Sequence, residues 1–176
     1  MIGGSSLKKI DLVKIICTGG MLTALTVLFQ AAPVFLPAIG LALSPLSTLP
    51  IAIAAVCNVL LGLFVIFSSA LILTMVSVQE TIILLFTTGL LGIVIGALLY
   101  RKGIIYSIIL SSIALFFGIT FLTYIVGIPV FIDLTRSLSI LITFLLFLLF
   151  SLVYATFWNI GLRKIMTFLN YAKIIN

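Results

Sequence analysis

The sequence predicts an all-α integral membrane protein: a single transmembrane domain over residues 1–176, built as a bundle of six transmembrane helices with both termini in the cytoplasm. The first observation is the composition, since 64% of the 176 residues are hydrophobic, 7% are charged and the mean hydropathy is +1.54. A soluble domain is about half apolar and about a quarter charged. The composition therefore excludes a water-soluble enzyme or binding module. The other two observations are the lengths of the apolar stretches and the placement of the basic residues between them.

Four apolar stretches each have the length of one crossing, because a helix needs about 20 apolar residues to span a hydrocarbon core about 30 Å thick. They are Leu12–Phe35, Thr81–Tyr100, Ile104–Val126 and Leu138–Ile160. Lysines precede the first stretch and basic pairs follow the second and the fourth, while glycine and proline follow the third. Each of the four is a predicted transmembrane helix.

The stretch from Pro45 to Val78 is harder to divide. Its 34 uncharged residues would make one helix of ~51 Å, which is long for one crossing and short for two. We place a break near Cys57–Asn58, which gives two short helices at about Leu49–Val56 and Val59–Val78. Such a pair must be tightly turned, tilted or shorter than the bilayer is thick.

Basic residues decide between five crossings and six. Cytoplasmic loops carry an excess of lysine and arginine, so Lys8, Lys9 and Lys14 place the N-terminus in the cytoplasm. With six crossings, Arg101–Lys102 and Arg163–Lys164 also face the cytoplasm, whereas five crossings would put both pairs outside. We therefore predict six crossings. The segments then expected on the outside are the Pro33–Ser47 loop, Gln79–Glu80 and the Gly127–Arg136 loop.

Polar residues at the predicted outer ends of the helices form our candidate substrate-binding set. Ionisable groups are costly to place in a membrane and tend to mark sites. The set consists of Gln30, Gln79, Glu80, Tyr124, Asp133 and Arg136. We expect these residues to converge on an outward-facing pocket. The Pro33–Ser47 loop is too apolar for a solvated turn, and we interpret it as a lid over this pocket.

Structural roles stay open for the charged members of the set. Glu80 would cap its helix, because negative charge is favourable near a helix N-terminus. Asp133 and Arg136 are three positions apart and would pair with each other. If they bind a ligand instead, Arg136 suits a carboxylate or a phosphate, and Glu80 or Asp133 suits an amine or a ring N–H donor. Trp158, near the predicted cytoplasmic end of its helix, is interpreted as an interfacial anchor.

Small residues spaced by four give a second signal, because they let another helix approach closely on one face. Gly92 and Gly96 form a GxxxG pair, which we interpret as packing inside the bundle. Gly20 and Ala24 have the same spacing on the first helix. Since that helix is expected at the edge of the bundle, their partner is either another helix of this chain or a partner protein.

We expect no catalytic activity, cofactor or metal site. The chain has no His and three acidic residues, which leaves few groups for acid–base chemistry. Cys17 and Cys57 stand 40 positions apart in apolar runs and form no metal motif. The net charge is +6, but the basic residues are spread in ones and twos. That pattern indicates membrane topology, and no nucleic-acid surface.

The layout of the whole chain resembles the substrate-binding S-components of energy-coupling factor transporters, and also an uncharacterised bacterial membrane family of the same superfamily. Four segments carry the resemblance. The first two are the basic start before Gly20-Met21-Leu22-Thr23-Ala24-Leu25 and the apolar segment from Pro37 to Pro45. The other two are the helix start Leu49-Pro50-Ile51 and the stretch Thr88-Gly89-Leu90-Leu91-Gly92, which runs on to Gly96 and Tyr100-Arg101-Lys102-Gly103.

The resemblance implies a function. S-components lie in the bacterial cell membrane, bind a vitamin or related micronutrient from outside under a lid formed by the first outer loop, and deliver it through a transmembrane coupling protein bound to two ATPase subunits. Their first helix contacts the coupling protein through an AxxxA surface. Gly20 and Ala24 stand at the matching positions here, with glycine in place of the first alanine. The nickel and cobalt members use an N-terminal His, which this sequence lacks.

Two other classes of function are weighed against transport. A structural or accessory membrane protein with the same fold would bind no small molecule, and its polar residues Glu80, Asp133 and Arg136 would be replaceable at little cost. An intramembrane enzyme would have to depend on Glu80 or Asp133, and neither stands in a metal motif.

Overall fold

The computed structural model describes residues 3–99, 103–128 and 139–171, with side chains described from residue 13 to residue 168 within these ranges. Every regular element in these ranges is helical. Five helical segments are long and apolar enough to cross a membrane, namely Val13–Phe35, Pro37–Cys57, Val78–Leu98, Ile104–Val126 and Ile140–Phe168. A shorter apolar helix, Val59–Thr74, lies between the second and the third. The prediction of an all-α, multi-pass membrane architecture is confirmed, and the sidedness of the termini stays a prediction.

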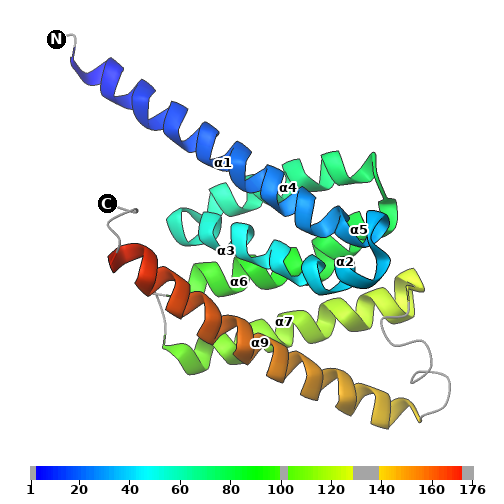
Figure 1. The fold of residues 1–176 in the computed structure, drawn as a ribbon. Helices are drawn as coiled ribbons and strands as arrows, with labels where there is room; N and C mark the ends of the chain where they lie inside the picture. The colour runs from blue at the N-terminus through cyan, green and yellow to red at the C-terminus, as the bar shows by residue number, and fades with distance from the viewer. Residues whose placement is uncertain (1–2, 100–102, 129–138, 172–176) are drawn as a thin grey trace.

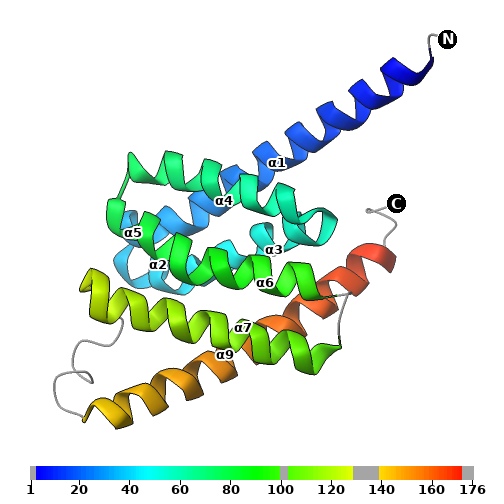
Figure 2. The ribbon, with the colours of Figure 1, turned by 180° about the vertical axis from the view of Figure 1, so that it is seen from behind.

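Successive segments run in opposite directions between the two ends of the bundle (Figures 1 and 2). The start of α1 and the end of α9 lie towards the same end of the molecule in both views. The elements in order are α1 (Gly3–Phe35), α2 (Pro37–Leu43), the 3-10 turn η1 (Ser44–Ser47), α3 (Thr48–Cys57), α4 (Val59–Thr74), α5 (Val78–Ile83), the π-helical η2 (Leu84–Thr88), α6 (Gly89–Leu98), α7 (Ile104–Phe121), the π-helical η3 (Leu122–Val126) and α9 (Ile140–Tyr171).

The long uncharged stretch breaks where the sequence predicts. α3 ends at Cys57, and the extended residue Asn58 caps α4 by accepting a hydrogen bond from the Leu60 backbone N–H at 2.9 Å. A short polar side chain at this position satisfies one of the free donors at a helix start. The result is two antiparallel helices of 10 and 16 residues.

Small residues let α3 sit inside the bundle. A Cβ added to Gly96 would lie 2.6 Å from the Ala52 carbonyl oxygen and 2.6 Å from the Ala55 Cβ, and one on Gly92 would lie 2.9 Å from the Ile51 side chain. Helices α3 and α6 therefore touch backbone to backbone, as small residues allow within a membrane. The prediction that the GxxxG pair packs within the bundle is confirmed.

The segment predicted as the Pro33–Ser47 loop is helical, which corrects that part of the prediction. Pro33 lies in the last turn of α1, and α2 and η1 follow after Leu36. The chain folds back so tightly that a Cβ on Gly40 would collide with the backbone of Ala32 and Pro33. Proline at the first position of α2 is compatible with a helix start.

The outward faces of the helices are apolar. Leu141 is 77% exposed, Leu71 is 73% exposed and Phe168 is 73% exposed. Apolar surface of this extent is what a lipid-facing helix presents. Trp158 does not belong to it: the indole is 5% exposed and packs in the core cluster with Leu162 and Met166. The interpretation of Trp158 as an interfacial anchor is wrong, because its position on α9 turns it towards the bundle.

A buried polar cluster joins α7 to α9. Asn159 accepts a hydrogen bond from the Ser107 hydroxyl through Oδ1, and its Nδ2 donates to the Ser111 hydroxyl at 3.1 Å and to the Ala155 carbonyl at 2.8 Å. All three polar side chains are buried. The cluster fixes the rotation of the last two helices relative to each other.

Candidate functional site

The site is built around the buried side chain of Gln30, near the end of α1. Its Nε2 donates to Glu80 Oε2 at 2.9 Å, while its Oε1 accepts from the Ser47 hydroxyl at 2.8 Å and from the Thr88 hydroxyl at 3.1 Å. Four elements thus meet at one amide: α1, η1, α5 and η2. The amide fixes the position of its three partners, because each would lose a hydrogen bond if it moved.

Glu80 is held in the first turn of α5. The helix begins after Ser77, whose hydroxyl accepts from the Glu80 backbone N–H at 3.3 Å. Ser77 is therefore the cap, and the Glu80 carboxylate extends instead across to Gln30 on α1. The structural alternative for Glu80 holds in part: Ser77 supplies the side-chain cap, and the Glu80 charge lies in the first turn, where the helix dipole favours it.

A cavity of about 340 Å³ opens beside this cluster. Its size lies in the range of small-molecule pockets, which are mostly apolar with a few placed polar groups. The polar residues on its wall are Ser44, Gln79, Glu80, Thr87, Thr88 and Tyr154. The apolar residues are Pro33, Leu41, Pro45, Ile83, Leu115, Ile119, Leu122, Ile128 and Phe150.

The two π-helical turns, η2 and η3, both border the cavity. Insertions of this kind are frequent at functional sites. The turn η2 carries Thr87 and Thr88 on the cavity wall, and η3 contributes Leu122. A Cβ on Gly118 would collide with the Phe86 carbonyl oxygen, so the backbones of α7 and η2 are in direct contact. This contact fixes the distance between the two sides of the cavity.

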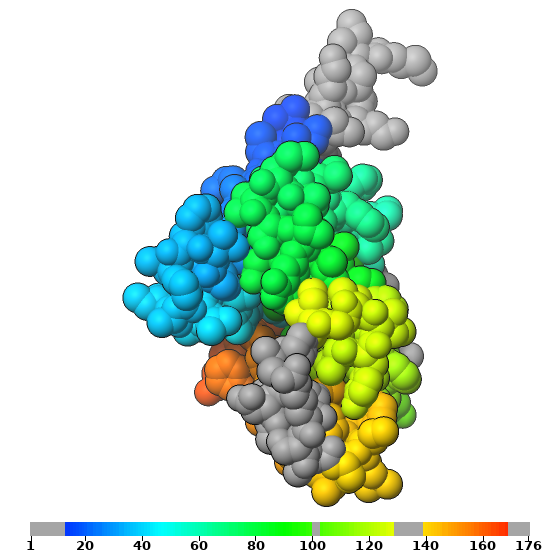
Figure 3. All heavy atoms as spheres, turned by 90° about the vertical axis from the view of Figure 1, so that its right-hand side faces the viewer, coloured from blue at the N-terminus to red at the C-terminus, as the bar shows by residue number. Residues whose placement is uncertain are grey.

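The segment predicted as a lid lies along the cavity, with Pro33, Leu41, Ser44 and Pro45 on its wall. Figure 3 looks onto the end of the bundle where this segment, the turn between α4 and α5 and the end of η3 lie next to one another. The segment is thus placed where a covering element would have to be. Whether it opens and closes stays a prediction.

The predicted set of six residues divides into three groups. Gln30, Gln79 and Glu80 come together: Gln79 and Glu80 line the cavity, and Gln30 bonds to Glu80. Tyr124 does not line this cavity. Asp133 and Arg136 lie outside the described residues.

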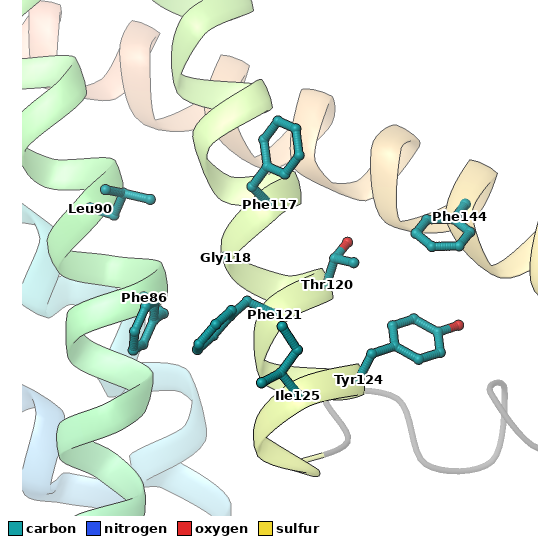
Figure 4. Close-up of a pocket in the computed structure, with 9 residues that line it drawn as sticks. All are labelled: Phe86, Leu90, Phe117, Gly118, Thr120, Phe121, Tyr124, Ile125 and Phe144. Carbon is teal, nitrogen blue, oxygen red and sulfur yellow. The ribbon is translucent and has the colours of Figure 1, made fainter.

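Tyr124 belongs to a second, entirely apolar groove of about 520 Å³ between η2, α7, η3 and α9 (Figure 4). Its ring stacks on Phe144 of α9 with centroids 5.6 Å apart, and Phe86 stacks on Phe121 at 4.4 Å. The expectation that Tyr124 converges with Glu80 is therefore wrong. The π-helical turn η3 sets the direction of this ring, and no sequence pattern predicts it.

Sequence reasoning missed Ser47, Thr88 and Tyr154. Serine and threonine are common in membrane helices and usually bond to their own helix backbone, so their presence alone gives no signal. Tyr154 lies on the cavity wall, with its hydroxyl beside Thr48 and Trp158. The spacing of Tyr154 and Trp158 by one helical turn was a signal for a shared inward face.

Gly20 and Ala24 lie on the exposed face of α1, and a Cβ on Gly20 would meet nothing within 4 Å. The inner face of α1, with Leu22, Thr23 and Thr26, is buried against the bundle. The two small residues therefore pack against no other helix among the described residues. Of the two interpretations of their spacing, contact with a partner protein stays a prediction.

The charges at the site are few. Glu80 is the one acidic side chain among the described residues, and no described lysine or arginine forms an ion pair with it. The described part of the chain also holds no group of three or more His, Cys, Asp or Glu side chains able to bind a metal. What the site offers chemically is a carboxylate and several hydroxyl oxygens against an apolar wall.

Comparison of the chain with protein-family models, with curated proteins and with solved structures finds no match. The class to which the protein is assigned therefore rests on its fold and its site: a helical, multi-pass membrane protein with an open, mostly apolar cavity that carries a few polar groups.

Proposed function

We propose that this chain is the membrane-embedded substrate-binding subunit of an energy-coupling factor type importer in a bacterial cell membrane. One observation carries the proposal: a cavity of small-molecule size whose wall combines a carboxylate, hydroxyls and apolar side chains. A bundle needing only to be stable would fill such a space, because unfilled volume in a core is destabilising. The resemblance of the sequence to S-components supplies the transport role.

In this proposal the cavity captures a vitamin or related micronutrient from outside. The α2 and η1 segment covers the cavity, since its residues Leu41, Ser44 and Pro45 already stand on the wall. The exposed face of α1 around Gly20 and Ala24 then contacts a transmembrane coupling protein, and two ATPase subunits supply the energy. Both termini face the cytoplasm, on the side where the basic residues gather.

A structural or accessory role is the second candidate, and one observation favours it. Both polar atoms of the Gln30 amide are already bonded within the protein. A polar network between helices is also what holds a bundle together in a membrane protein that binds no ligand. The two candidates differ in whether the cavity is occupied.

Mass spectrometry of small molecules extracted from the purified protein tests the proposal. The Ile83→Trp variant fills the cavity from its wall, and Ile72→Trp, on the exposed face of α4, is the matched control. We expect one compound to accompany the wild type and the control and to be lost from Ile83→Trp. A wild type that carries no compound and responds to no micronutrient in thermal unfolding would favour the accessory role.

A further inference from the structure

The charge balance of the cavity points to the chemical class of its ligand, an inference that rests on the proposed function. The Glu80 carboxylate has one oxygen on Gln30 and no basic partner among the described residues. The described basic side chains are Lys14, on the part of α1 that projects from the bundle, and Arg163 and Lys164, near the end of α9. These lie towards the opposite end of the molecule from α5 (Figure 1). The Glu80 side chain is half-buried on a mostly apolar wall, and a carboxylate that has lost part of its hydration is stabilised when a counter-charge reaches it.

The neighbouring hydroxyl protons are already committed. The Thr88 hydroxyl donates to Gln30 Oε1 at 3.1 Å, and the Thr87 hydroxyl donates to the Ile83 carbonyl at 2.6 Å. A hydroxyl has one proton and two lone pairs, so these two groups have only their lone pairs left for a ligand. Together with the Glu80 carboxylate they place three hydrogen-bond acceptors on the cavity wall, while Ser44, Gln79 and Tyr154 on the same wall can accept or donate.

The Gln30 amide is oriented by its partners. Its two hydroxyl partners hold Oε1, which directs Nε2 to Glu80. A carboxylate accepts at both of its oxygens, and Gln30 occupies one site on Oε2. A ligand that adds a donor completes the arrangement, whereas one that adds an acceptor faces a negative charge and lone pairs.

We propose that the cavity binds a cationic ligand, an ammonium group on an apolar body, with the ammonium on Glu80 beside Thr87 and Thr88. The apolar body lies against the opposite wall, where Leu115, Ile119 and Leu122 face the cavity. Charge-assisted hydrogen bonds of this kind are about twice as strong as neutral ones. The positive charge offsets the lost hydration of the half-buried carboxylate.

Three probes with the same apolar body and different end groups test this class: 2-phenylethylamine, 2-phenylethanol and 3-phenylpropionate. Their affinities are measured by saturation-transfer NMR on the protein in nanodiscs, and empty nanodiscs correct for partition into lipid. We expect the amine to bind about tenfold more tightly than the alcohol, and the carboxylate to bind least. In Glu80→Gln, which keeps an acceptor for Gln30, the preference for the amine disappears. The Ile83→Trp variant is expected to lose binding of all three probes.

Several results would overturn the inference: equal affinities for amine and alcohol, tighter binding of the carboxylate, an amine preference that survives in Glu80→Gln, or no saturable amine binding at millimolar concentration. If Glu80→Gln fails to fold, Thr87→Val replaces it, with a smaller preference for the amine over the alcohol as the expected result. A co-purifying anionic or neutral compound would overturn the cationic class and leave the proposed function standing. Amine binding by a protein that carries no compound and supports no uptake would contradict the proposed function alone.

Discussion

The side chain of Gln30 on α1 donates to the carboxylate of Glu80 on α5 at 2.9 Å, which joins residues 50 positions apart. The bond connects α1 to α5 at one end of the bundle. Because Gln30 also holds Ser47 and Thr88, one amide sets the relative positions of the polar residues around the cavity. The arrangement of the site therefore depends on a residue that is itself buried.

Replacing Gln30 by Leu is expected to destabilise the protein by about 1–3 kcal/mol, the cost of leaving buried polar partners unpaired. Glu80, Ser47 and Thr88 would each lose a hydrogen bond while the side-chain volume stays similar. Thermal unfolding in detergent measures the effect. Leu28→Ala, on the exposed face of the same helix, is the control and should change stability little. Equal effects of the two substitutions would contradict a stabilising role for the amide.

Replacing Gly96 by Ala is expected to cost about 1–3 kcal/mol, the usual cost of overpacking a core. The added Cβ would meet the Ala52 carbonyl oxygen and the Ala55 Cβ at 2.6 Å and push α3 from α6. Gly20→Ala is the matched control, because a Cβ there meets nothing within 4 Å. Chemical denaturation of both variants compares them. The packing of α3 on α6 would be wrong if Gly96→Ala were as stable as Gly20→Ala.

Asn159→Leu should loosen α7 from α9. Hydrogen bonds between membrane helices contribute about 0.6 kcal/mol each on average, and this substitution removes the bonds to Ser107 and Ser111. We expect a loss of about 1 kcal/mol, with Ser151→Ala as control because the Ser151 hydroxyl bonds only within its own helix. A double-mutant cycle with Ser107→Ala isolates the coupling. Additive effects of Asn159→Leu and Ser107→Ala would refute the cluster.

Cysteine labelling tests whether the short helix α4 crosses the membrane. Cys57 is exposed before α4, and Met75, which is 88% exposed, follows its end. Two variants, both with Cys17→Ala, each keep one cysteine. In the variant with Cys57→Ala and Met75→Cys, an impermeant maleimide should modify position 75 in intact cells. In the variant that keeps Cys57, the same reagent should modify Cys57 only after the membrane is permeabilised. Modification of both positions from one side would contradict a crossing by α4, and a reversed pattern would contradict cytoplasmic termini.

Much of the fold was predictable because it follows from length, charge and small residues. The break at Asn58 was visible as a polar residue in an apolar run, and Gly92 and Gly96 carried the spacing of a packed helix pair. The association of Gln30 with Glu80 was predictable in outline, since both stand at ends of helices expected on the same side. These features depend on local sequence and on the thickness of a bilayer.

Features that depend on the rotation of a helix were not predictable. Trp158 is buried and Tyr124 lies on a different groove from Glu80 because the faces of α9 and η3 turn that way. Apolar residues surround these helices on all sides, so hydropathy gives no inward direction. The two π-helical turns also shift the register of Thr87, Thr88 and Tyr124, and their sequences contain no distinctive residues. The prolines of the Pro33–Ser47 segment predict a loop because proline marks turns, yet proline also starts helices.

An experimental structure of the protein purified from its native membrane tests the central claim most directly, by showing what stands next to Glu80. The account predicts density for a small molecule in the cavity, with a donor group within hydrogen-bond distance of the Glu80 carboxylate and an apolar part against Leu115 and Ile119. It also predicts that the bond from Gln30 to Glu80 is retained. A cavity closed by its own side chains, with the Glu80 carboxylate bonded to protein groups alone, would contradict the account.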